Sequence, residues 1–311
     1  MTVDGQQWTT NGRLTNILFI NAILLLLGRG WQHLADSVPV RALLWNEDLF
    51  RPLIENLTTL EWSGYVANLQ YDHWISYLTY GFGFFYLLLA FSLIMIKIGG
   101  NLKLPPIYRM LKISLLLTSI FFFILAFCYY LDKNYLLGQW GEYALQWMSP
   151  LFLSWYIFKT IPRSRLVLLM KIALSITFIC HGLYAIGYYP VPGSFQSMLM
   201  QILPLTETQA ISILKVAGIL DFILSIVIFI PQRKIVLVAL AYAAIWGFLT
   251  ALARPVAHFY SQFWLESLLQ WTPEFLFRVP HFLIPIWLFL FTYHRVSPPH
   301  SITPDLQSLH Q

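Results

Sequence analysis

The sequence predicts an all-α polytopic membrane protein with eight transmembrane helices, arranged as two parallel four-helix repeats. Hydrophobic residues make up 58% of the 311 residues, and charged residues only 11%. A soluble domain carries about 25% charged residues, so much of this chain needs lipid as its solvent. The apolar residues gather in long runs, and the loops between these runs alternate between basic and acidic.

Each predicted span satisfies or approaches the requirement for about 20 mostly apolar residues in a membrane-crossing helix. Glycine and proline interrupt the pattern between the runs, because neither residue continues a helix without cost. The first run is followed by "GRGWQHL" and not by a small-residue cleavage site, so we expect a retained helix rather than a removed signal peptide. The eight spans, of which the fourth is short, are 14–34, 75–97, 110–131, 143–159, 166–188, 208–230, 234–253 and 277–294.

The loop charges orient these spans. Cytoplasmic loops collect lysine and arginine; here the second, fourth and sixth loops are basic, whereas the odd-numbered loops are acidic. The alternation predicts a bacterial-type inner membrane protein with both termini in the cytoplasm. Residues 1–13 then form a cytoplasmic tail, and residues 296–311 form a polar, disordered cytoplasmic tail. Since the net charge of +5 reflects this topology, no nucleic-acid partner is expected.

Two external segments, 36–73 and 255–276, are long and rich in aromatic residues. Within them, "LLWNEDLFRPLIENL" (43–57) and "HFYSQFWLESLLQW" (258–271) place apolar residues at helical intervals. This spacing is typical of amphipathic helices that lie in the membrane interface. We therefore expect interfacial helices on the external side.

The two halves of the chain, 14–160 and 161–295, resemble each other. Each half has an even number of spans, so the two units share one orientation and form a parallel repeat, related by an axis along the membrane normal. The corresponding residues occur in the same order in both halves: Arg29 with His181, Gly30 with Gly182, Gly83 with Gly218, Tyr86 with Asp221, and Pro150 with Pro280.

The second half also carries the motifs of a known type of membrane unit. The stretch "CHGLYAIG" (180–187) ends the fifth span, "AGILDFILSIVIFIP" (217–231) forms the sixth, and a short basic turn and two further helices follow. This half resembles the DoxX-like four-helix membrane proteins, and the first half looks like a more diverged copy. The resemblance implies a link to sulfur oxidation with quinone as acceptor, or to redox-defence enzymes, and it implies no catalytic residue.

Ionisable side chains inside the predicted spans define a candidate ligand or proton pocket. A charge at the bilayer centre costs about 2.5–3.5 kcal/mol, so such a residue needs a partner, a water-filled cavity or a function. At 1.5 Å per residue, Asp221 lies almost at the midplane. Three potential cations lie roughly 6–8 Å outside it by the same rise: Arg29, His181 and Lys215. Two residues nearer the external surface are the candidate pocket mouth: Arg254 and His281.

Two interpretations of this polar layer stay open. In the structural one, Asp221 pairs with Arg29 or His181 between helices, and Lys215 extends its apolar stem to the surface. In the functional one, the pocket opens outward and holds an anionic ligand, a quinone head group or a proton path. His181 would then donate to a quinone oxygen, and Asp221 would relay the proton.

Neither a metal site nor a haem is expected. The eight histidines show no ligand spacing such as H-x-x-x-H. The two cysteines, Cys128 and Cys180, are far apart and form no C-x-x-C motif. The cofactor stays unknown: the resemblance to DoxX-like proteins implies quinone, and haem and zinc are not expected. No nucleophile elbow, Walker loop or dinucleotide-binding motif occurs either.

The sequence favours a redox-associated membrane subunit that handles quinone or protons in an outward-facing pocket. Since no electron carrier is encoded, such a protein needs an external or membrane-bound redox partner in addition to the lipid bilayer. Two alternatives stay open. One is a transporter or channel for a small anionic or polar solute, and the other is a non-catalytic scaffold that recruits a partner through its external segments. Whether the protein is an enzyme is not decided by the sequence.

Overall fold

The computed structural model describes residues 3–99 and 105–294, and every regular element in these two ranges is helical. Long and short helices are interspersed along the chain. In chain order the elements are α1 (Val3–Leu34), α2 (Val40–Leu44), α3 (Glu47–Leu57), α4 (Trp62–Ala67), α5 (Leu69–Gly99), α6 (Pro105–Asp132), α7 (Leu137–Gly141), α8 (Ala144–Phe158), α9 (Arg163–Ala185), α10 (Gly193–Ile202), α11 (Glu207–Val227), α12 (Arg233–Ala257), the 3-10 helix η1 (Ser261–Phe263), α13 (Trp264–Leu276) and α14 (Pro280–His294).

Several of these helices are long and apolar enough to cross a membrane. Within the described ranges six qualify on their own, namely α1, α5, α6, α9, α11 and α12. The segments Ser261–Leu276 and Pro280–His294 qualify together as a pair bent by 41°, which gives up to seven spans. The prediction of an all-helical, multi-pass membrane protein is therefore confirmed.

The eight predicted spans all coincide with helices, but two of these helices are short. Helices α8 and α14 have 15 residues each, which corresponds to about 22 Å at 1.5 Å per residue. The hydrocarbon core of a bilayer is about 30 Å thick, so helix length alone does not establish a count of eight. That count stays a prediction.

Several predicted boundaries differ from the structure: α5 begins at Leu69, six residues before the predicted span, and α6 begins at Pro105, five residues before it. Helix α1 begins at Val3, so most of the predicted tail 1–13 is helical. Helix α9 ends at Ala185, before the predicted boundary at residue 188, and Gly187 follows with a φ of 85° that favours glycine. The predicted disordered tail, 296–311, lies outside the described residues.

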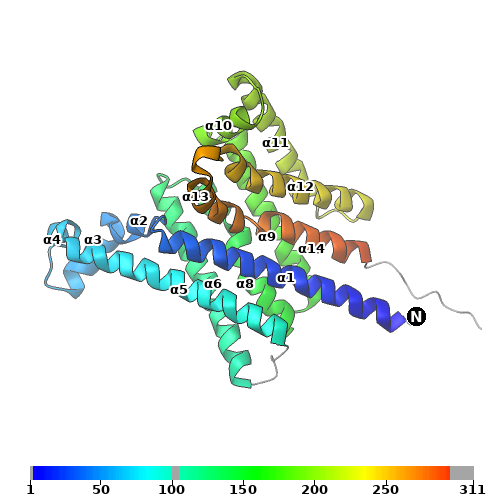
Figure 1. Ribbon diagram of the computed structural model, residues 1–311, viewed down its shortest axis with the longest axis horizontal. Helices are drawn as coiled ribbons and strands as arrows, with labels where there is room; N and C mark the ends of the chain where they lie inside the picture. The colour runs from blue at the N-terminus through cyan, green and yellow to red at the C-terminus, as the bar shows by residue number, and fades with distance from the viewer. Residues whose placement is uncertain (1–2, 100–104, 295–311) are drawn as a thin grey trace, which may run out of the picture.

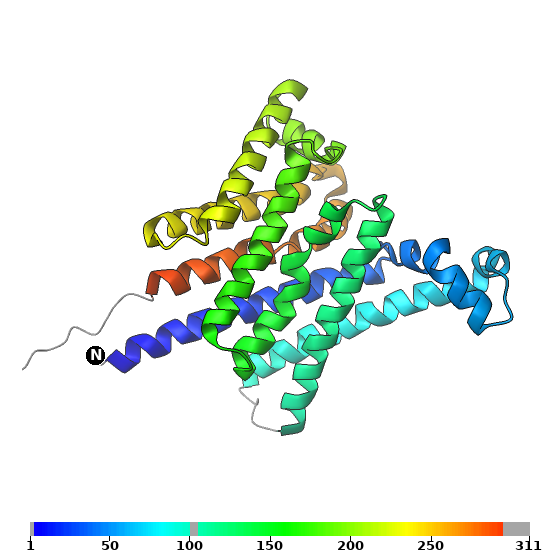
Figure 2. The ribbon, with the colours of Figure 1, turned by 180° about the vertical axis from the view of Figure 1, so that it is seen from behind.

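The long helices form two sets that cross each other. Helices α1, α5, α12 and α14 run in one general direction, and α6, α8, α9 and α11 run in another (Figures 1 and 2). The connections that carry the short helices α2–α4, α7, α10 and α13 lie toward the upper left of Figure 1. The first turn of α1 and the last turn of α14 lie at the opposite, lower right side. We refer to the side with the short helices α2–α4, α7, α10 and α13 as the short-helix side.

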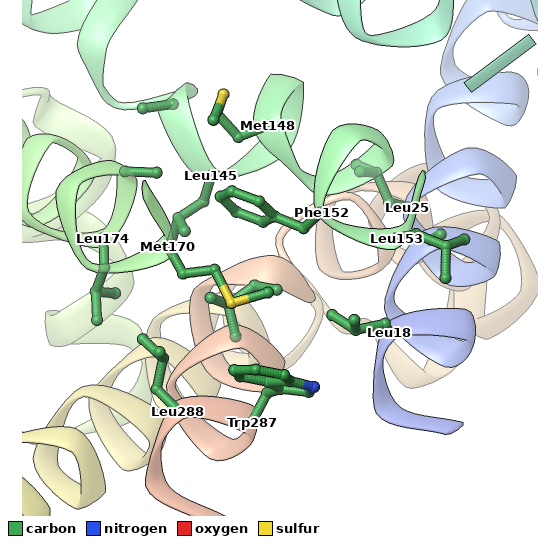
Figure 3. Close-up of a cluster of buried hydrophobic side chains, with 14 of the residues drawn as sticks. Leu18, Leu25, Leu145, Met148, Phe152, Leu153, Met170, Leu174, Trp287 and Leu288 are labelled. Carbon is green, nitrogen blue, oxygen red and sulfur yellow. The ribbon is translucent and has the colours of Figure 1, made fainter. Parts of the chain in front are cut away.

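The hydrophobic core lies where α1, α8, α9 and α14 meet. Figure 3 shows Leu18 and Leu25 of α1, Phe152 of α8, Met170 of α9 and Trp287 of α14 around one apolar centre. The Trp287 indole is fully buried, and its Nε1 donates to a backbone carbonyl of α1 at 3.1 Å. The first and last membrane helices are thereby joined at the centre of the molecule.

Glycines permit close helix approach at corresponding places in the two halves. A Cβ on Gly83 would lie 3.0 Å from the backbone oxygen of Gly30, where α1 crosses α5. A Cβ on Gly218 would likewise lie 3.0 Å from the backbone oxygen of Gly182, where α9 crosses α11. Small residues at such crossings let two membrane helices pack backbone to backbone.

The predicted external segment 36–73 contains three short helices, α2, α3 and α4, and its last residues form the first turn of α5. Helix α3 begins at Glu47 because the Asn46 side chain caps it, accepting the N–H of Leu49 at 3.1 Å. Arg41 anchors the segment to α5, since its guanidinium lies 2.7 Å from Asp72 and 3.3 Å from Asp36. The second external segment folds as η1 and α13, whereas α10 was not predicted from the sequence.

Candidate functional site

Ionisable side chains from several elements meet near the short-helix side of the bundle. They come from α1, from the link after α7, from α9, α12 and α13, and from the start of α14. Contacts between neighbouring members connect most of the set. We refer to this set as the polar cluster: Arg29, Glu142, His181, Arg254, Glu274, Arg278 and His281.

Glu274 joins two arginines in the cluster. Its carboxylate lies 3.3 Å from Nε of Arg254 and forms a shorter ion pair with Arg278, four residues further along the chain. The Arg278 guanidinium also donates to the Glu274 carbonyl at 3.1 Å. One carboxylate therefore serves two guanidinium groups, and its single charge balances only one of them.

Two histidines stack face to face beside these arginines. The rings of His181 and His281 have centroids 5.3 Å apart and planes only 5° from parallel. Nδ1 of His281 lies 2.9 Å from the Arg278 carbonyl. Because a carbonyl only accepts, this nitrogen carries the hydrogen, and Nε2 of His281 is left as an acceptor in the neutral ring. Each ring can thus present a nitrogen to a ligand.

Glu142 is the second carboxyl of the cluster and lies outside the helices that are long enough to cross a membrane. One oxygen lies 3.9 Å from Nε2 of His181, and the other accepts from the Gln139 side chain at 2.6 Å. Burial raises the pKa of Glu142 to about 7, against the opposing effect of Arg278 and Arg254. Glu142 can therefore gain or lose a proton near neutral pH.

Arg29 is almost fully buried, with 2% of its surface exposed, and its contacts are neutral. Its guanidinium donates to the side-chain oxygens of Gln32, at 2.5 Å, and of Gln146. In the described part of the chain no carboxylate lies within 4.0 Å of it, and its Nε has no hydrogen-bond partner. Three aromatic rings lie 5.6, 5.1 and 4.0 Å from its Cζ: Tyr129, Tyr143 and Phe277.

The polar cluster holds an excess of positive charge. It contains three guanidinium groups, which stay charged in proteins, and two carboxyl groups. The cluster is nevertheless accessible, because the side chains of Glu142, His181, Glu274 and the two paired arginines keep between 14% and 27% of their surface exposed. A partly accessible, net positive interior is suited to binding an anion or the polar head of a larger ligand.

Three of the six predicted site residues directly contact other members of the polar cluster that are distant in the sequence. His181 and His281 stack on each other, and Arg254 pairs with Glu274. Arg29 packs its guanidinium on Phe277, which precedes Arg278. Two of the four candidate pocket residues, Arg29 and His181, and both candidate mouth residues, Arg254 and His281, are therefore parts of one arrangement.

The other two predicted residues, Asp221 and Lys215, are not part of this arrangement. The Asp221 carboxyl accepts from the Tyr242 hydroxyl on α12 at 3.3 Å, and it has no cation within 4.0 Å in the described ranges. The expected pairing of Asp221 with Arg29 or His181 is therefore wrong. Lys215 is exposed on α11, as the structural interpretation expected.

Sequence reasoning missed Glu142, Glu274 and Arg278 as members of the site. It placed them with the loops and helix ends, where charged residues are ordinary. One signal was available, since Glu274 and Arg278 are four residues apart and can meet on consecutive turns of a helix. No spacing in the sequence indicated Glu142, because it lies in the link after α7 and contacts His181 on α9, which is far away in the sequence.

Metal binding has no support in the described ranges. No group of three or more histidine, cysteine, aspartate or glutamate residues there could hold a metal ion. Cys128 and Cys180 are both free thiols.

Fold and site together define a multi-pass helical membrane protein with a buried, net positive polar cluster. In comparison with known proteins, no family model matches the sequence, and no significant match was found among curated proteins or among solved structures. The DoxX-like resemblance of the second half stays a prediction.

Proposed function

We propose that the polar cluster is a binding site for an anionic ligand in an inner membrane protein, reached from the outer side. The observation that carries the proposal is the excess of positive charge among buried and partly exposed side chains, with buried Arg29 lacking any carboxylate partner in the described part of the chain. An uncompensated buried charge is costly. A bound anion would supply the missing counter-charge. Of the functions left open by the sequence, this observation favours handling of a small anionic solute.

The proposed architecture has eight spans in two parallel four-helix units. It is supported by the helix contacts, which follow the same pattern in both halves. Helix α1 packs on α5 as α9 packs on α11, and α6 packs on α8 as α12 packs on α14. Between the halves, α1 meets α14 as α9 meets α8. The glycine crossings described above fall at positions that correspond in the two halves.

The proposed orientation puts the short-helix side outside and both termini in the cytoplasm. Basic residues begin or end the long helices on the side opposite the polar cluster, as with Lys97 at the end of α5, Arg163 at the start of α9 and Arg233 at the start of α12. This distribution is the one expected for cytoplasmic helix ends.

A quinone-linked redox role is the second candidate, and the stacked histidines favour it. The neutral imidazole of His181 can donate a hydrogen bond to a quinone oxygen, whereas neutral His281 keeps its hydrogen on the nitrogen that faces the Arg278 carbonyl. Glu142, beside His181, could exchange the accompanying proton near neutral pH. This candidate also fits the DoxX-like resemblance, and it needs a redox partner because the chain encodes no electron carrier.

The experiment that tests the proposal is mass spectrometry of small molecules retained by the protein purified in mild detergent. We expect the wild type to retain an anion and the Arg254→Gln variant to lose it, since this variant leaves the Arg278–Glu274 pair intact. Arg51→Gln is the matched control, because Arg51 is an exposed residue of α3 that pairs only with Glu47 and Glu55.

Each outcome of this experiment decides between the candidates. A retained quinone, lost from Arg254→Gln, would favour the redox role over the anion site. If no molecule is retained, inorganic phosphate and acetate are titrated while the midpoint of thermal unfolding is followed. A midpoint that neither anion raises would contradict the proposal and leave the polar cluster as a contact between helices.

Anion affinity is expected to fall as the pH rises through about 7. Below this pH Glu142 is protonated and neutral; above it Glu142 adds a negative charge beside Arg254, Arg278 and His181. Because like charges repel, we expect about a tenfold loss of affinity between pH 6 and 8, equal to about 1.4 kcal/mol. Titration calorimetry with phosphate at both pH values measures it, with acetate as the probe whose own charge is constant in this range. In Glu142→Gln the acetate affinity should stay high at both values, and an unchanged pH dependence in that variant would assign it to another group.

A further inference from the structure

A second ionisable side chain is buried in the membrane-spanning part of the protein, apart from the polar cluster. Asp221 lies on α11, and only 2% of its surface is exposed. It is six residues from the end of α11, or about 9 Å at 1.5 Å per residue. Because protein surrounds the Asp221 carboxyl, water cannot solvate a negative charge on it.

The side chains that contact the Asp221 carboxyl in the described ranges are neutral. The hydroxyl of Tyr242 donates to Oδ1 at 3.3 Å. The side chain of Trp246, one turn further along α12, also donates to the carboxyl. No lysine, arginine or histidine nitrogen lies within 4.0 Å of it in those ranges.

The charged or titratable side chains of the helices around Asp221 make other contacts. Helix α10 has no charged residue in its sequence. On α9, Lys171 donates to the Ile228 carbonyl at 2.6 Å and His181 stacks on His281. On α11, Lys215 is exposed. On α12, Arg233 donates to the Thr292 carbonyl, and Arg254 pairs with Glu274.

The backbone around Asp221 is held firmly against α9. Ser225 donates to the Asp221 carbonyl at 2.7 Å, and Ser175 of α9 donates to the Ser225 carbonyl at 2.9 Å. Gly218, three residues before Asp221, meets Gly182, which follows His181. The carboxyl therefore lies about one helical turn from the crossing that carries a histidine of the polar cluster.

We infer that Asp221 is a proton-binding site within the membrane that carries its proton at neutral pH. An ionised carboxylate buried without a cation costs several kcal/mol, and binding a proton removes that cost. The donors Tyr242 and Trp246 stabilise the ionised form whenever the proton leaves. The site can thus release a proton as well as bind one. This inference is independent of the anion site proposed for the polar cluster.

Infrared difference spectroscopy of the protein with Asp221 against the protein with Asp221→Asn tests the inference directly. Asparagine has the shape of aspartate and keeps one acceptor oxygen for a donor such as Tyr242, so the variant should fold. Glu142→Gln is present in every protein compared, because Glu142 would itself be partly protonated near pH 7. At about pH 7 we expect the protein with Asp221 to show the C=O stretching band of a protonated carboxyl, and the protein with Asp221→Asn to lack it. Glu207→Gln is the matched control, since Glu207 is exposed in the first turn of the same helix and should leave the band unchanged.

A pH titration of the protein with Asp221 and of a second variant tests whether Asp221 binds and releases a proton. The band should disappear from the protein with Asp221 as the pH is raised, because the proton leaves. In Tyr242→Phe, which lacks one donor to the ionised form, it should persist to higher pH. Absence of the band at neutral pH from the protein with Asp221 would overturn the inference, as would a band that persists in Asp221→Asn.

Discussion

Replacing Glu274 with glutamine is expected to lower the free energy of unfolding by about 3 kcal/mol, the low end of what breaking a buried ion pair costs. Glutamine keeps the shape of the side chain but removes the charge that lies between Arg254 and Arg278. The two guanidinium groups would then repel each other, with Glu142 as the one carboxyl left in the cluster. We take the low end because the Glu274 side chain keeps 27% of its surface exposed, which lets water screen part of the charge.

The midpoint of thermal unfolding in mild detergent, followed by circular dichroism, measures this effect. Glu266→Gln is the matched control, because Glu266 is an exposed residue of the same helix. Removing a partner together with the charge, in Glu274→Gln with Arg254→Met, should recover part of the loss. Phosphate should also raise the midpoint of Glu274→Gln, since an anion can replace the lost carboxylate. Equal midpoints for Glu274→Gln and Glu266→Gln would show that Glu274 does not hold the cluster together.

The helices could be predicted from the sequence because long apolar runs depend only on local composition. Helices α1, α5, α6, α9, α11 and α12 follow this rule directly. Helix α14 coincides with the predicted eighth span, but it has only 15 residues and passes the length criterion for a span only together with Ser261–Leu276, to which it is bent by 41°. Helix α10 escaped prediction because its ten residues are too short a run to stand out beside the spans.

The members of the site were harder to predict than the helices, because their contacts depend on how each helix is rotated. The sequence places Arg29 inside a predicted span, but it cannot show that Gln146, 117 residues away, provides a hydrogen-bond acceptor. Asp221 was assigned a cationic partner because a buried charge usually has one. Its partner is Tyr242, which reads in the sequence as an ordinary aromatic residue of a span. Neutral hydrogen-bond donors of this kind leave no charge pattern to recognise.

Substituting alanine for Gly247 is expected to be among the most disruptive single changes in the protein. A Cβ at this position would lie 2.3 Å from the carbonyl oxygen of His281 and 2.7 Å from its carbonyl carbon. Both are backbone atoms, so no side chain can turn away, and α12 and α14 would have to separate. Overpacking of this kind costs about 1–3 kcal/mol, which exceeds the gain of up to about 1 kcal/mol from replacing a helical glycine with alanine.

Gly81→Ala is the control that separates packing from helix propensity. Gly81 lies in α5, and a Cβ there would meet nothing within 4 Å. This variant should therefore unfold at an equal or higher temperature than the wild type, whereas Gly247→Ala should unfold at a lower one. Because the α12–α14 contact positions His281 between Arg278 and His181, Gly247→Ala should also weaken anion binding before the protein unfolds. If Gly247→Ala instead raises the unfolding temperature as Gly81→Ala does, the two helices do not touch at His281, and the stacked histidines are not held in the arrangement on which the proposed site depends.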